Sequence, residues 1–381
     1  MMRTRLGLFY GALFLAIGIY LPYWPLWLEG KGLNPTEIGA LMALGIAGRA
    51  VINPLVAQWA DRSGRRRQWI IWLLIGALVV VLPFHWAEGV WLLAGLTLAH
   101  YGLTGPVMPL AESLTMRLVQ DRGLDYGHIR LWGSVSFIGA ALLGGMVVAE
   151  AGAGSVYLMM VLAVAISALA APLLPDVRIE GPPNRRSPLF EVLSDRRFVI
   201  FLLGCAALQG SHGVYYAFGS IHWRNEGLSE ALIGVYWAEG VVAEILLFLI
   251  GARLLRRYGS LGLLILAGVV GVIRWIALGL TVDPALIAMA QAGHAFTYGA
   301  AHLGAMHHVQ GHIAPGLSAT AQSLYSVIVM GLGTGLTILL AGPLFEGLGG
   351  GSYHVMAITS ALGLLTMVWL RFGGVRKTNP S

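Results

Sequence analysis

The sequence contains a single cysteine and few charged residues. Cys205 lies within an apolar stretch, and one cysteine cannot form a disulfide within the chain. Charged residues make up 11% of the 381 residues, whereas a soluble domain carries about 25%. Hydrophobic residues make up 57%, and the mean hydropathy is +0.75. These values exclude an ordinary soluble protein and indicate a membrane protein with many spans.

Long hydrophobic runs are abundant. A helix that crosses a membrane needs about 20 apolar residues, and twelve such runs predict an all-α integral membrane protein with twelve transmembrane helices. The predicted spans cover residues 6–28, 37–58, 69–86, 90–118, 130–149, 154–174, 198–222, 231–254, 261–281, 284–308, 317–341 and 352–371. The first run has no small-residue cleavage site and leads into eleven more, so we expect a span and not a removable signal.

Basic residues are distributed unevenly between the two predicted sides of the membrane. Twelve spans place both termini on one side, and the segments on that side hold 20 of the 24 lysine and arginine residues. The other side holds only Lys31 and Arg224, while Arg49 and Arg274 lie within spans. The positive-inside rule therefore predicts that both termini are cytoplasmic, and we expect the membrane to be a bacterial cytoplasmic (inner) membrane. The net charge of +6 reflects this orientation, and nucleic acid is not an expected partner.

A polar stretch divides the predicted spans into two groups of six. Residues 175–197 contain prolines and alternating charges, which are typical of a linker with a short surface helix. We expect an N-terminal six-helix bundle over residues 1–174, a cytoplasmic linker over 175–197 and a C-terminal six-helix bundle over 198–381. Two halves with equal numbers of spans are typical of a duplicated transporter with its site between the halves.

The loop after the second predicted span carries a basic motif. It reads Asp-Arg-Ser-Gly-Arg-Arg-Arg over residues 61–67, and the shorter Arg-Arg-Tyr-Gly over 256–259 follows the eighth span. A glycine permits a tight turn, and arginines are anchored at lipid head groups. The motif resembles the signature loop of the major facilitator superfamily, although Val56 replaces the glycine that usually precedes it. The resemblance implies that a loop for conformational change includes Asp61, Arg62, Gly64 and Arg65.

Charged residues inside the predicted spans are the main candidates for a site, because they are costly in a membrane and usually functional. Glu112 and Arg130 lie in neighbouring spans. A pair that faces the cavity would let Arg130 bind a carboxylate or hydroxyls bidentately. The structural alternative is a helix-end arginine that Glu112 merely neutralises. Arg49 would be a second cation for an anionic substrate if it faces the cavity, and a structural residue otherwise.

The later spans hold candidates for proton coupling. Glu239 and Glu244 are five residues apart in span 8, which offsets them by about 140° around a helix. One of them would carry a proton, and Glu244 is the better candidate because it lies deeper. Arg274 and His294 lie in spans 9 and 10, where His294 would relay a proton or bind substrate. The alternatives are a fixed salt bridge between Glu244 and Arg274 and a histidine that only packs.

Aromatic and polar side chains would complete the cavity. His212 and Tyr215 fall on one helical stripe of span 7, and Tyr20 and Trp27 of span 1 would belong to an aromatic wall. The alternative is that these aromatic residues belong to the interfacial belt. Two histidines over 308–312 have a spacing that can bind metal, but no acid or cysteine completes a site, so no metal is expected.

Several of these residues resemble those of the lactose permease and its relatives within the superfamily. Residues 18–28 are similar to the first helix of that permease. Glu112 and Arg130 match its sugar-binding acid and arginine, and Arg274 and His294 match its arginine and histidine. The string Tyr-Gly-x-x-Arg-Leu-Trp-Gly-Ser and the short chain are similar more narrowly to the phenylpropionate permease branch.

The chain also departs from the lactose permease. Thr297 stands where that permease has a proton-carrying glutamate, and His212 and Tyr215 stand where it has two aspartates. The span-8 glutamate of the permease has no counterpart at the same place, although Glu239 and Glu244 lie close by. The sugar and proton machinery therefore cannot be transferred as a whole.

The resemblance implies a secondary transporter that works by alternating access, as a monomer, with a small-molecule substrate and protons. The expected cargo is a small aromatic carboxylate such as 3-phenylpropionate, imported with a proton, and no cofactor is expected beyond the proton gradient. Arginines would hold the carboxylate, aromatic residues the ring, and Glu244 the proton. The alternatives are a proton-coupled sugar or nucleoside symporter and, next, a proton-driven drug exporter.

Two other classes of protein fit the sequence less well. An intramembrane enzyme would need a nucleophile with a base in register or a metal cluster, and the sequence offers neither. An assembly factor without transport activity would not need charged residues in four or more spans.

Overall fold

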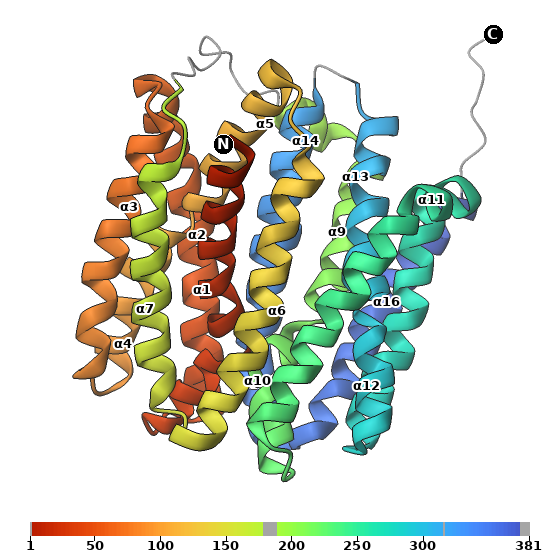
Figure 1. The fold of residues 1–381 in the computed structure, drawn as a ribbon. Helices are drawn as coiled ribbons and strands as arrows, with labels where there is room; N and C mark the ends of the chain where they lie inside the picture. Colours follow the sequence, from red (N-terminus) through yellow and green to blue (C-terminus); the bar gives the residue numbers. More distant parts are fainter. Residues whose placement is uncertain (1, 178–188, 315–316, 374–381) are drawn as a thin grey trace, which may run out of the picture. The chain divides into compact units, whose positions relative to one another are not determined.

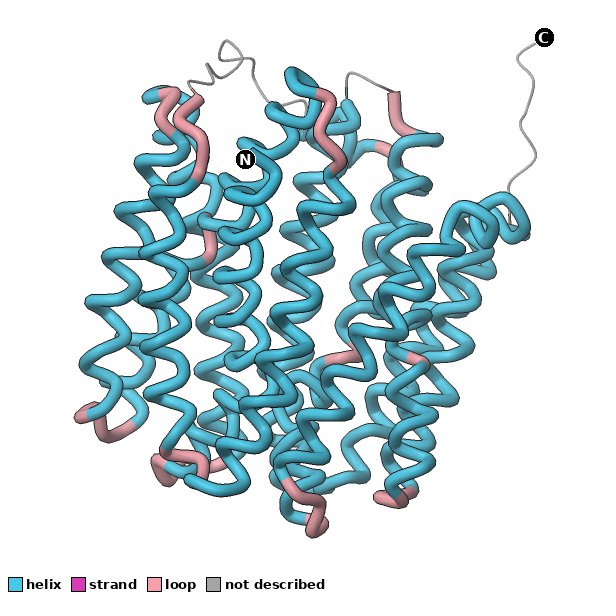
Figure 2. Tube along the Cα trace, viewed as in Figure 1, coloured by secondary structure: helices cyan, strands magenta, loops and turns pink. Residues whose placement is uncertain are grey.

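A computed structural model describes residues 2–177, 189–314 and 317–373, and every regular element in these ranges is helical (Figures 1 and 2). The helices before the linker are α1 (Met2–Gly30), α2 (Pro35–Ser63), α3 (Arg66–Val81), α4 (Val90–Thr104), α5 (Val107–Arg122), α6 (Tyr126–Ala151) and α7 (Ser155–Ala170). The later helices are α8 (Leu189–Ser194), α9 (Arg196–Gly210), α10 (Gly213–Asn225), α11 (Glu230–Leu280), α12 (Pro284–Ala292), α13 (Ala301–His312), α14 (Ser318–Tyr325), α15 (Thr334–Leu348) and α16 (Ser352–Phe372). The short 3-10 or π-helical segments are η1 (Leu82–His85), η2 (Ala171–Leu173), η3 (Ala295–Ala300), η5 (Ser326–Gly333) and η6 (Gly349–Gly351). The middle of the predicted linker and the basic C-terminal end lie outside the described ranges.

These helices account for the twelve predicted spans. Eight helical stretches are long and apolar enough to cross a membrane, and two of them contain 51 and 53 residues. At 1.5 Å per residue, each of these two is long enough for two crossings of a hydrocarbon core about 30 Å thick. The turn inside α11 falls at Gly259, whose φ of 69° is a positive value that glycine adopts without strain. Two further spans are broken helices, α4 with α5 and α12 with α13, so the all-α fold with twelve transmembrane helices is confirmed.

The helix breaks fall where the sequence weakens a helix. Gly105 and Pro106 separate α4 from α5, and a proline removes a backbone donor and crowds the preceding turn. Span 7, predicted as one helix, is also interrupted, since α9 ends at Gly210 and α10 begins at Gly213. The break places Ser211 and His212 between two helix ends.

The helix that contains the fifth predicted span begins about one turn before residue 130. α6 begins at Tyr126, because the side chain of Asp125 accepts a hydrogen bond from the backbone N–H of His128 at 3.1 Å. An aspartate at this position satisfies a backbone donor that the helix itself cannot. Arg130 therefore lies inside the helix and not at its end.

The chain packs into two compact units that cut across the two halves of the sequence. Unit 1 comprises Met1–Arg185, Tyr215–Val241 and Ile338–Gly349, and unit 2 comprises Arg186–Val214, Val242–Thr337 and Gly350–Ser381. In unit 1, α10 and parts of α11 and α15 pack with helices that precede the linker. The division into bundles over 1–174 and 198–381 remains a prediction.

Small residues allow the helices of unit 1 to approach closely. A Cβ atom added to Gly18 of α1 would lie 2.8 Å from the backbone oxygen of Phe137 in α6. Close packing of this kind stabilises helix pairs in membranes, where burial of apolar side chains supplies little driving force. It fixes α1 against α6, the two helices that supply much of one candidate site.

Candidate functional site

A buried polar cluster surrounds Arg274 in unit 2. The Arg274 side chain is 2% exposed, and its Nη2 donates to Gln291 Oε1 at 2.8 Å. Its Nη1 donates to Thr297 Oγ1 at 3.0 Å and lies 3.3 Å from His294 Nδ1. The guanidinium lies 4.4 Å from the ring centre of Trp275. Span 10, a broken helix, therefore supplies three polar partners to one cation from span 9.

The donors and acceptors of this cluster fix the protonation of its histidines. His212 Nδ1 lies 3.0 Å from the carbonyl oxygen of Gln209, which can only accept, so Nδ1 carries the proton. Thr297 accepts from Arg274, and its hydroxyl lies 3.0 Å from His212 Nε2 and 3.4 Å from the carbonyl oxygen of His294, so the shorter contact places its proton toward His212 Nε2. An arginine can only donate, so Nδ1 of His294 is an acceptor. The site is thus a single guanidinium with two neutral imidazoles.

Glu244 borders the same broken helix. Its Cγ atom lies 3.2 Å from the position that a Cβ on Gly299 would take, and Gly299 belongs to the π-helical segment η3. Segments of π-helix are frequent at functional sites. Glu239, the other candidate acid, is half-buried and belongs to unit 1, whereas Glu244 belongs to unit 2.

A second cluster in unit 1 contains the first pair of predicted residues. The guanidinium of Arg130 lies 3.9 Å from the ring centre of Phe14. The phenol of Tyr126 donates to Glu112 Oε1 at 3.4 Å and also interacts with Arg130. Glu112 and Arg130 interact electrostatically, but no ion pair within 4.0 Å joins them in the part of the chain that the structure describes. Tyr126 therefore stands between the two charges.

Arg49 lies against an aromatic column in unit 1. Its guanidinium is 4.7 Å from the ring centre of Tyr101, whose hydroxyl is hydrogen-bonded to that of Tyr20. Tyr20 stacks on Trp24 at 6.0 Å, and Trp24 stacks on Trp27 at 4.5 Å. The structure thus places Arg49, Tyr20 and Trp27, all predicted site residues, along one continuous set of side chains.

His212 and Tyr215 do not share a cluster. The ring of Tyr215 stacks on Trp237 at 4.5 Å in unit 1, whereas His212 lies in the Arg274 cluster of unit 2. The expected common stripe assumed a continuous helix, and the break before Gly213 removes that assumption.

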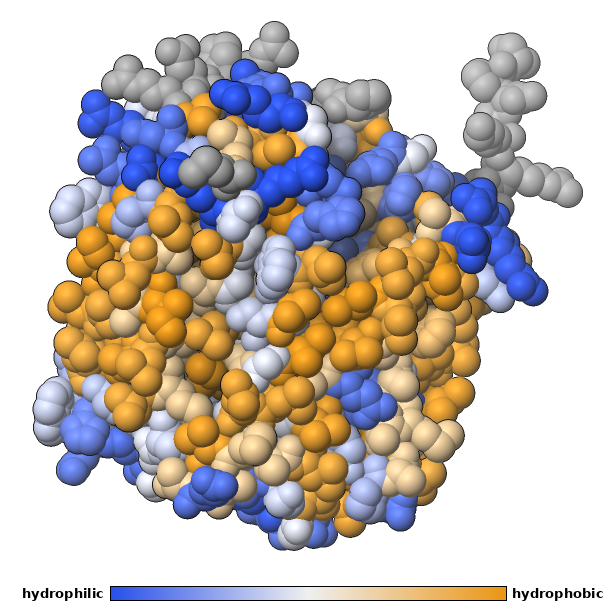
Figure 3. Space-filling model, viewed as in Figure 1, coloured by the Kyte–Doolittle hydropathy of each residue, from blue (hydrophilic) through white to orange (hydrophobic). Residues whose placement is uncertain are grey.

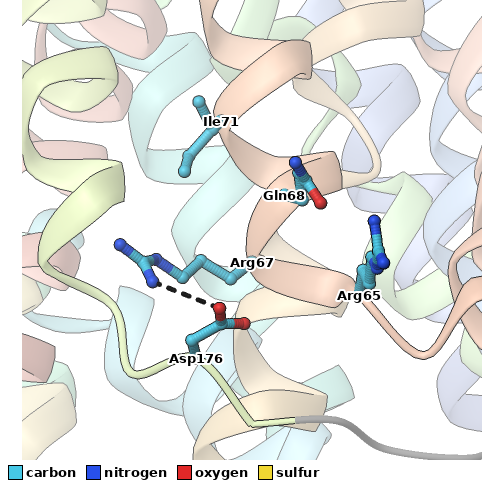
Figure 4. A pocket seen from close by; sticks show the side chains of 5 residues that line it. All are labelled: Arg65, Arg67, Gln68, Ile71 and Asp176. Atoms are coloured by element: carbon cyan, nitrogen blue, oxygen red, sulfur yellow. Dashed lines mark ion pairs between the residues drawn. The ribbon is translucent and has the colours of Figure 1, made fainter.

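The signature loop forms the turn that its sequence predicts. Gly64 ends α2 with a φ of 66°, and Asp61 pairs with Arg66 at 2.6 Å. Arg67 donates to the backbone oxygen of Pro172 at 2.8 Å and lies 3.6 Å from Asp176. A pocket of about 630 Å³ lies beside these residues (Figure 4), and its lining consists of Arg65, Arg67, Gln68, Ile71 and Asp176. Arg62 is exposed on the same turn.

Several members of the clusters were missed by the sequence analysis. Phe14, Tyr101 and Trp275 are aromatic residues that each lie under a guanidinium. The sequence points to each arginine but not to the ring beside it. Phe14 and Tyr101 come from other helices than their arginines, whereas Trp275 follows Arg274 directly in the chain. Within the described ranges, no group of three or more His, Cys, Asp or Glu residues is placed to hold a metal ion.

Comparison with known proteins identifies the family. Residues 3–355 match the family described as MFS_1 like. The chain is a transporter of the major facilitator superfamily. It is 31% identical to the probable 3-phenylpropionic acid transporter of Escherichia coli over 93% of this chain and 94% of that protein. It is 27% identical to the maltose permease of Geobacillus stearothermophilus, over 97% and 94% of the two chains.

Solved structures agree on the fold. The nucleoside transporter NupG superposes with a TM-score of 0.85 over 97% of this chain and 99% of that one, at 16% sequence identity. The family and the fold identify a multi-pass membrane transporter for a small molecule, and not an enzyme.

Proposed function

We propose that this transporter imports a small aromatic carboxylate, similar to 3-phenylpropionate, together with a proton. It would act by alternating access as a monomer in a bacterial inner membrane, with both termini in the cytoplasm. The name of the 31% identical relative supports the cargo. The concentration of basic residues on one side supports the orientation.

The observation that carries the proposal is the Arg130 site. A half-buried guanidinium lies on the face of Phe14, and its charge is not neutralised by a direct ion pair with Glu112. A planar guanidinium binds a carboxylate bidentately. In the same unit, half-buried Tyr20 ends the aromatic column and would meet a ring, whereas Trp27 is 4% exposed and packs inside the column. An aromatic acid combines the two kinds of group that these side chains recognise.

Proton coupling is assigned to the second half of the chain. The support for Glu244 is its position beside η3, where its Cγ atom lies 3.2 Å from the position of a Cβ on Gly299. The Arg274 cluster, with its neutral histidines, would carry the change in charge when Glu244 gains or loses a proton. Carboxylates inside membrane spans are frequent members of proton relays.

Titration calorimetry on the purified protein tests the cargo. Phenylpropionate, a galactoside and a nucleoside would be titrated between pH 5.5 and 8. We expect phenylpropionate binding with proton uptake in the native protein, no binding in Arg130→Ala, and binding weakened about tenfold or more in Arg130→Lys because the bidentate fork is lost. Arg117→Ala is the matched control, since Arg117 pairs with Asp121 on an exposed part of α5. Unchanged affinity in Arg130→Ala would overturn the assignment.

A sugar or nucleoside is the second candidate cargo. The hydroxyls of Tyr20 and Tyr101 and the carboxylate of Glu112 are hydrogen-bonding groups that suit a polyol. The 27% identical maltose permease supports this alternative. Binding of the galactoside or the nucleoside in the same titration, lost in Glu112→Gln, would favour it.

A further inference from the structure

A long groove lies on the surface of unit 1 between α1, α6 and α7. It has a volume of about 950 Å³, and Gly7, Gly11 and Ala12 of α1 lie along it. Apolar side chains from the three helices line most of its length, including Leu8, Leu15, Leu131, Val135, Ile166 and Leu169. Several of these side chains are exposed in the structure, as expected for a surface that meets lipid.

The length of the groove matches one leaflet of a bilayer. Its lining runs along α1 from Arg3 to Leu15. At 1.5 Å per residue this is about 18 Å, slightly more than half of a hydrocarbon core about 30 Å thick. A transmembrane helix from a partner protein would need a surface across both leaflets, whereas a lipid chain needs only one.

One end of the groove is polar and basic. Arg3 and Thr4 of α1 and His128 of α6 line it there. An acid, Asp125, accepts from the His128 ring at 2.7 Å, and Arg3 forms no ion pair among the described residues. Figure 3 shows hydrophilic side chains gathered at the end where α1 begins and apolar ones along the helices beyond it. The groove therefore has the two parts of an amphiphile, a cationic end and an apolar length.

We propose that this groove binds one acyl chain of an anionic phospholipid, with the phosphate at Arg3 and His128. The proposed orientation makes this a lipid of the cytoplasmic leaflet. Arginine binds phosphate oxygens through its planar fork, and juxtamembrane cations attract anionic lipids. The lipid would brace α1 against α6, which also carry Phe14 and Arg130.

Two pairs of variants separate the two parts of the site. Gly11→Leu fills the groove, and a Cβ at Gly11 meets no atom closer than 3.9 Å, so the first atom of the new side chain causes no clash. Gly139→Leu is its control, since a Cβ at Gly139 on α6 meets nothing within 4 Å and Gly139 does not line the groove. Arg3→Gln removes the cationic end, and Arg5→Gln removes an exposed arginine of the same helix outside the groove.

The full-length protein would be reconstituted with photoreactive phosphatidylglycerol or phosphatidylcholine, and the labelled residues mapped by mass spectrometry. We expect labelling of the groove by phosphatidylglycerol, a loss of tenfold or more in Gly11→Leu, and loss of the preference for the anionic lipid in Arg3→Gln. Gly139→Leu and Arg5→Gln should match the native protein. Equal labelling by both lipids, or labelling that Gly11→Leu does not change, would overturn the proposal. Retained phenylpropionate binding in Gly11→Leu would separate this result from the proposed transport function.

Discussion

The guanidinium of Arg224, in the last turn of α10, forms an ion pair with the carboxylate of Glu29 near the end of α1. Close by in the same unit, Thr36 donates to Glu346 at 2.5 Å. Both contacts join helices that precede the linker to helices that follow it, at ends that the proposed orientation places outside. Alternating access would require these contacts to break when the outer side opens.

The Glu29–Arg224 ion pair should bias the conformational equilibrium by a small amount. The two side chains are 29% and 27% exposed, and a partly exposed pair contributes at most about 1 kcal/mol, which is a shift of up to about fivefold. We expect Glu29→Gln to increase hydrogen exchange of the backbone around residues 141–145 of α6 and 230–234 of α11, two segments that approach each other closely in unit 1. The charge reversal of both partners, Glu29→Arg with Arg224→Glu, should restore the native exchange.

The control for this experiment is Glu88→Gln. Glu88 is exposed and forms no ion pair in the part of the chain that the structure describes. An equal increase in exchange in Glu88→Gln would mean that net charge, and not the ion pair, holds the two segments together.

Glycines bring α6 and α11 into backbone contact within unit 1. A Cβ on Gly145 would lie 2.8 Å from the Tyr23 hydroxyl and 3.2 Å from Cα of Ala231. Because a backbone atom cannot swing aside, we expect Gly145→Ala to reduce the free energy of unfolding by about 1–3 kcal/mol. Thermal unfolding in detergent measures this loss, and Gly139→Ala on the same helix should cause little change because its Cβ meets open space. Similar losses in both variants would exclude the packing explanation.

The sequence was sufficient to predict the number of membrane spans because such spans are long and apolar. Arg274 and His294, which the resemblance to the lactose permease pairs, lie 3.3 Å apart, and their roles remain a prediction. Their partners Gln291 and Thr297 were not predicted as site residues. Contacts across three helices depend on how the helices rotate and break, and hydropathy carries no information on rotation.

The helix breaks show the same limit. The prediction of a common face for His212 and Tyr215 assumed a continuous helix, and the interruption around His212 removes that assumption. Glycines at 210 and 213 are a signal for such a break. In a chain with 52 glycines, however, a single pair does not stand out from the glycines that serve only close packing.

The start of α6 should become less stable in acid. Hydrogen bonds from the ring and the backbone N–H of His128 hold the pKa of the Asp125 carboxyl below its ordinary value. Its capping contribution is therefore complete above the ordinary aspartate pKa and disappears as the pH falls through the lowered value. Hydrogen exchange at residues 128–130 should rise over that range in the native protein. Asp125→Asn keeps a capping oxygen and should show no such pH dependence; an identical rise in this variant would assign the effect to another group.

The hydroxyl of Thr297 joins Arg274 to His212. Its removal should therefore destabilise the whole cluster, although only one small group is lost. Thr297→Val keeps the shape and leaves the Arg274 Nη1 donor and the His212 Nε2 acceptor without this partner. Loss of a buried hydrogen-bond partner costs about 1–3 kcal/mol. We expect that loss in thermal unfolding, together with a transport rate at least tenfold lower in proteoliposomes.

Thr297→Ser is the matched control, because it removes one methyl group and keeps the hydroxyl that accepts from Arg274 and donates to His212. Serine at this position should retain most of the stability and the transport rate. Counterflow, in which substrate exchanges without net proton movement, separates two roles of the cluster. If Thr297→Val loses uphill transport but keeps counterflow, the hydroxyl acts in proton coupling; if both are lost, it holds the substrate site in shape. Native rates of Thr297→Val in both assays would show that the Arg274 cluster takes no part in the mechanism.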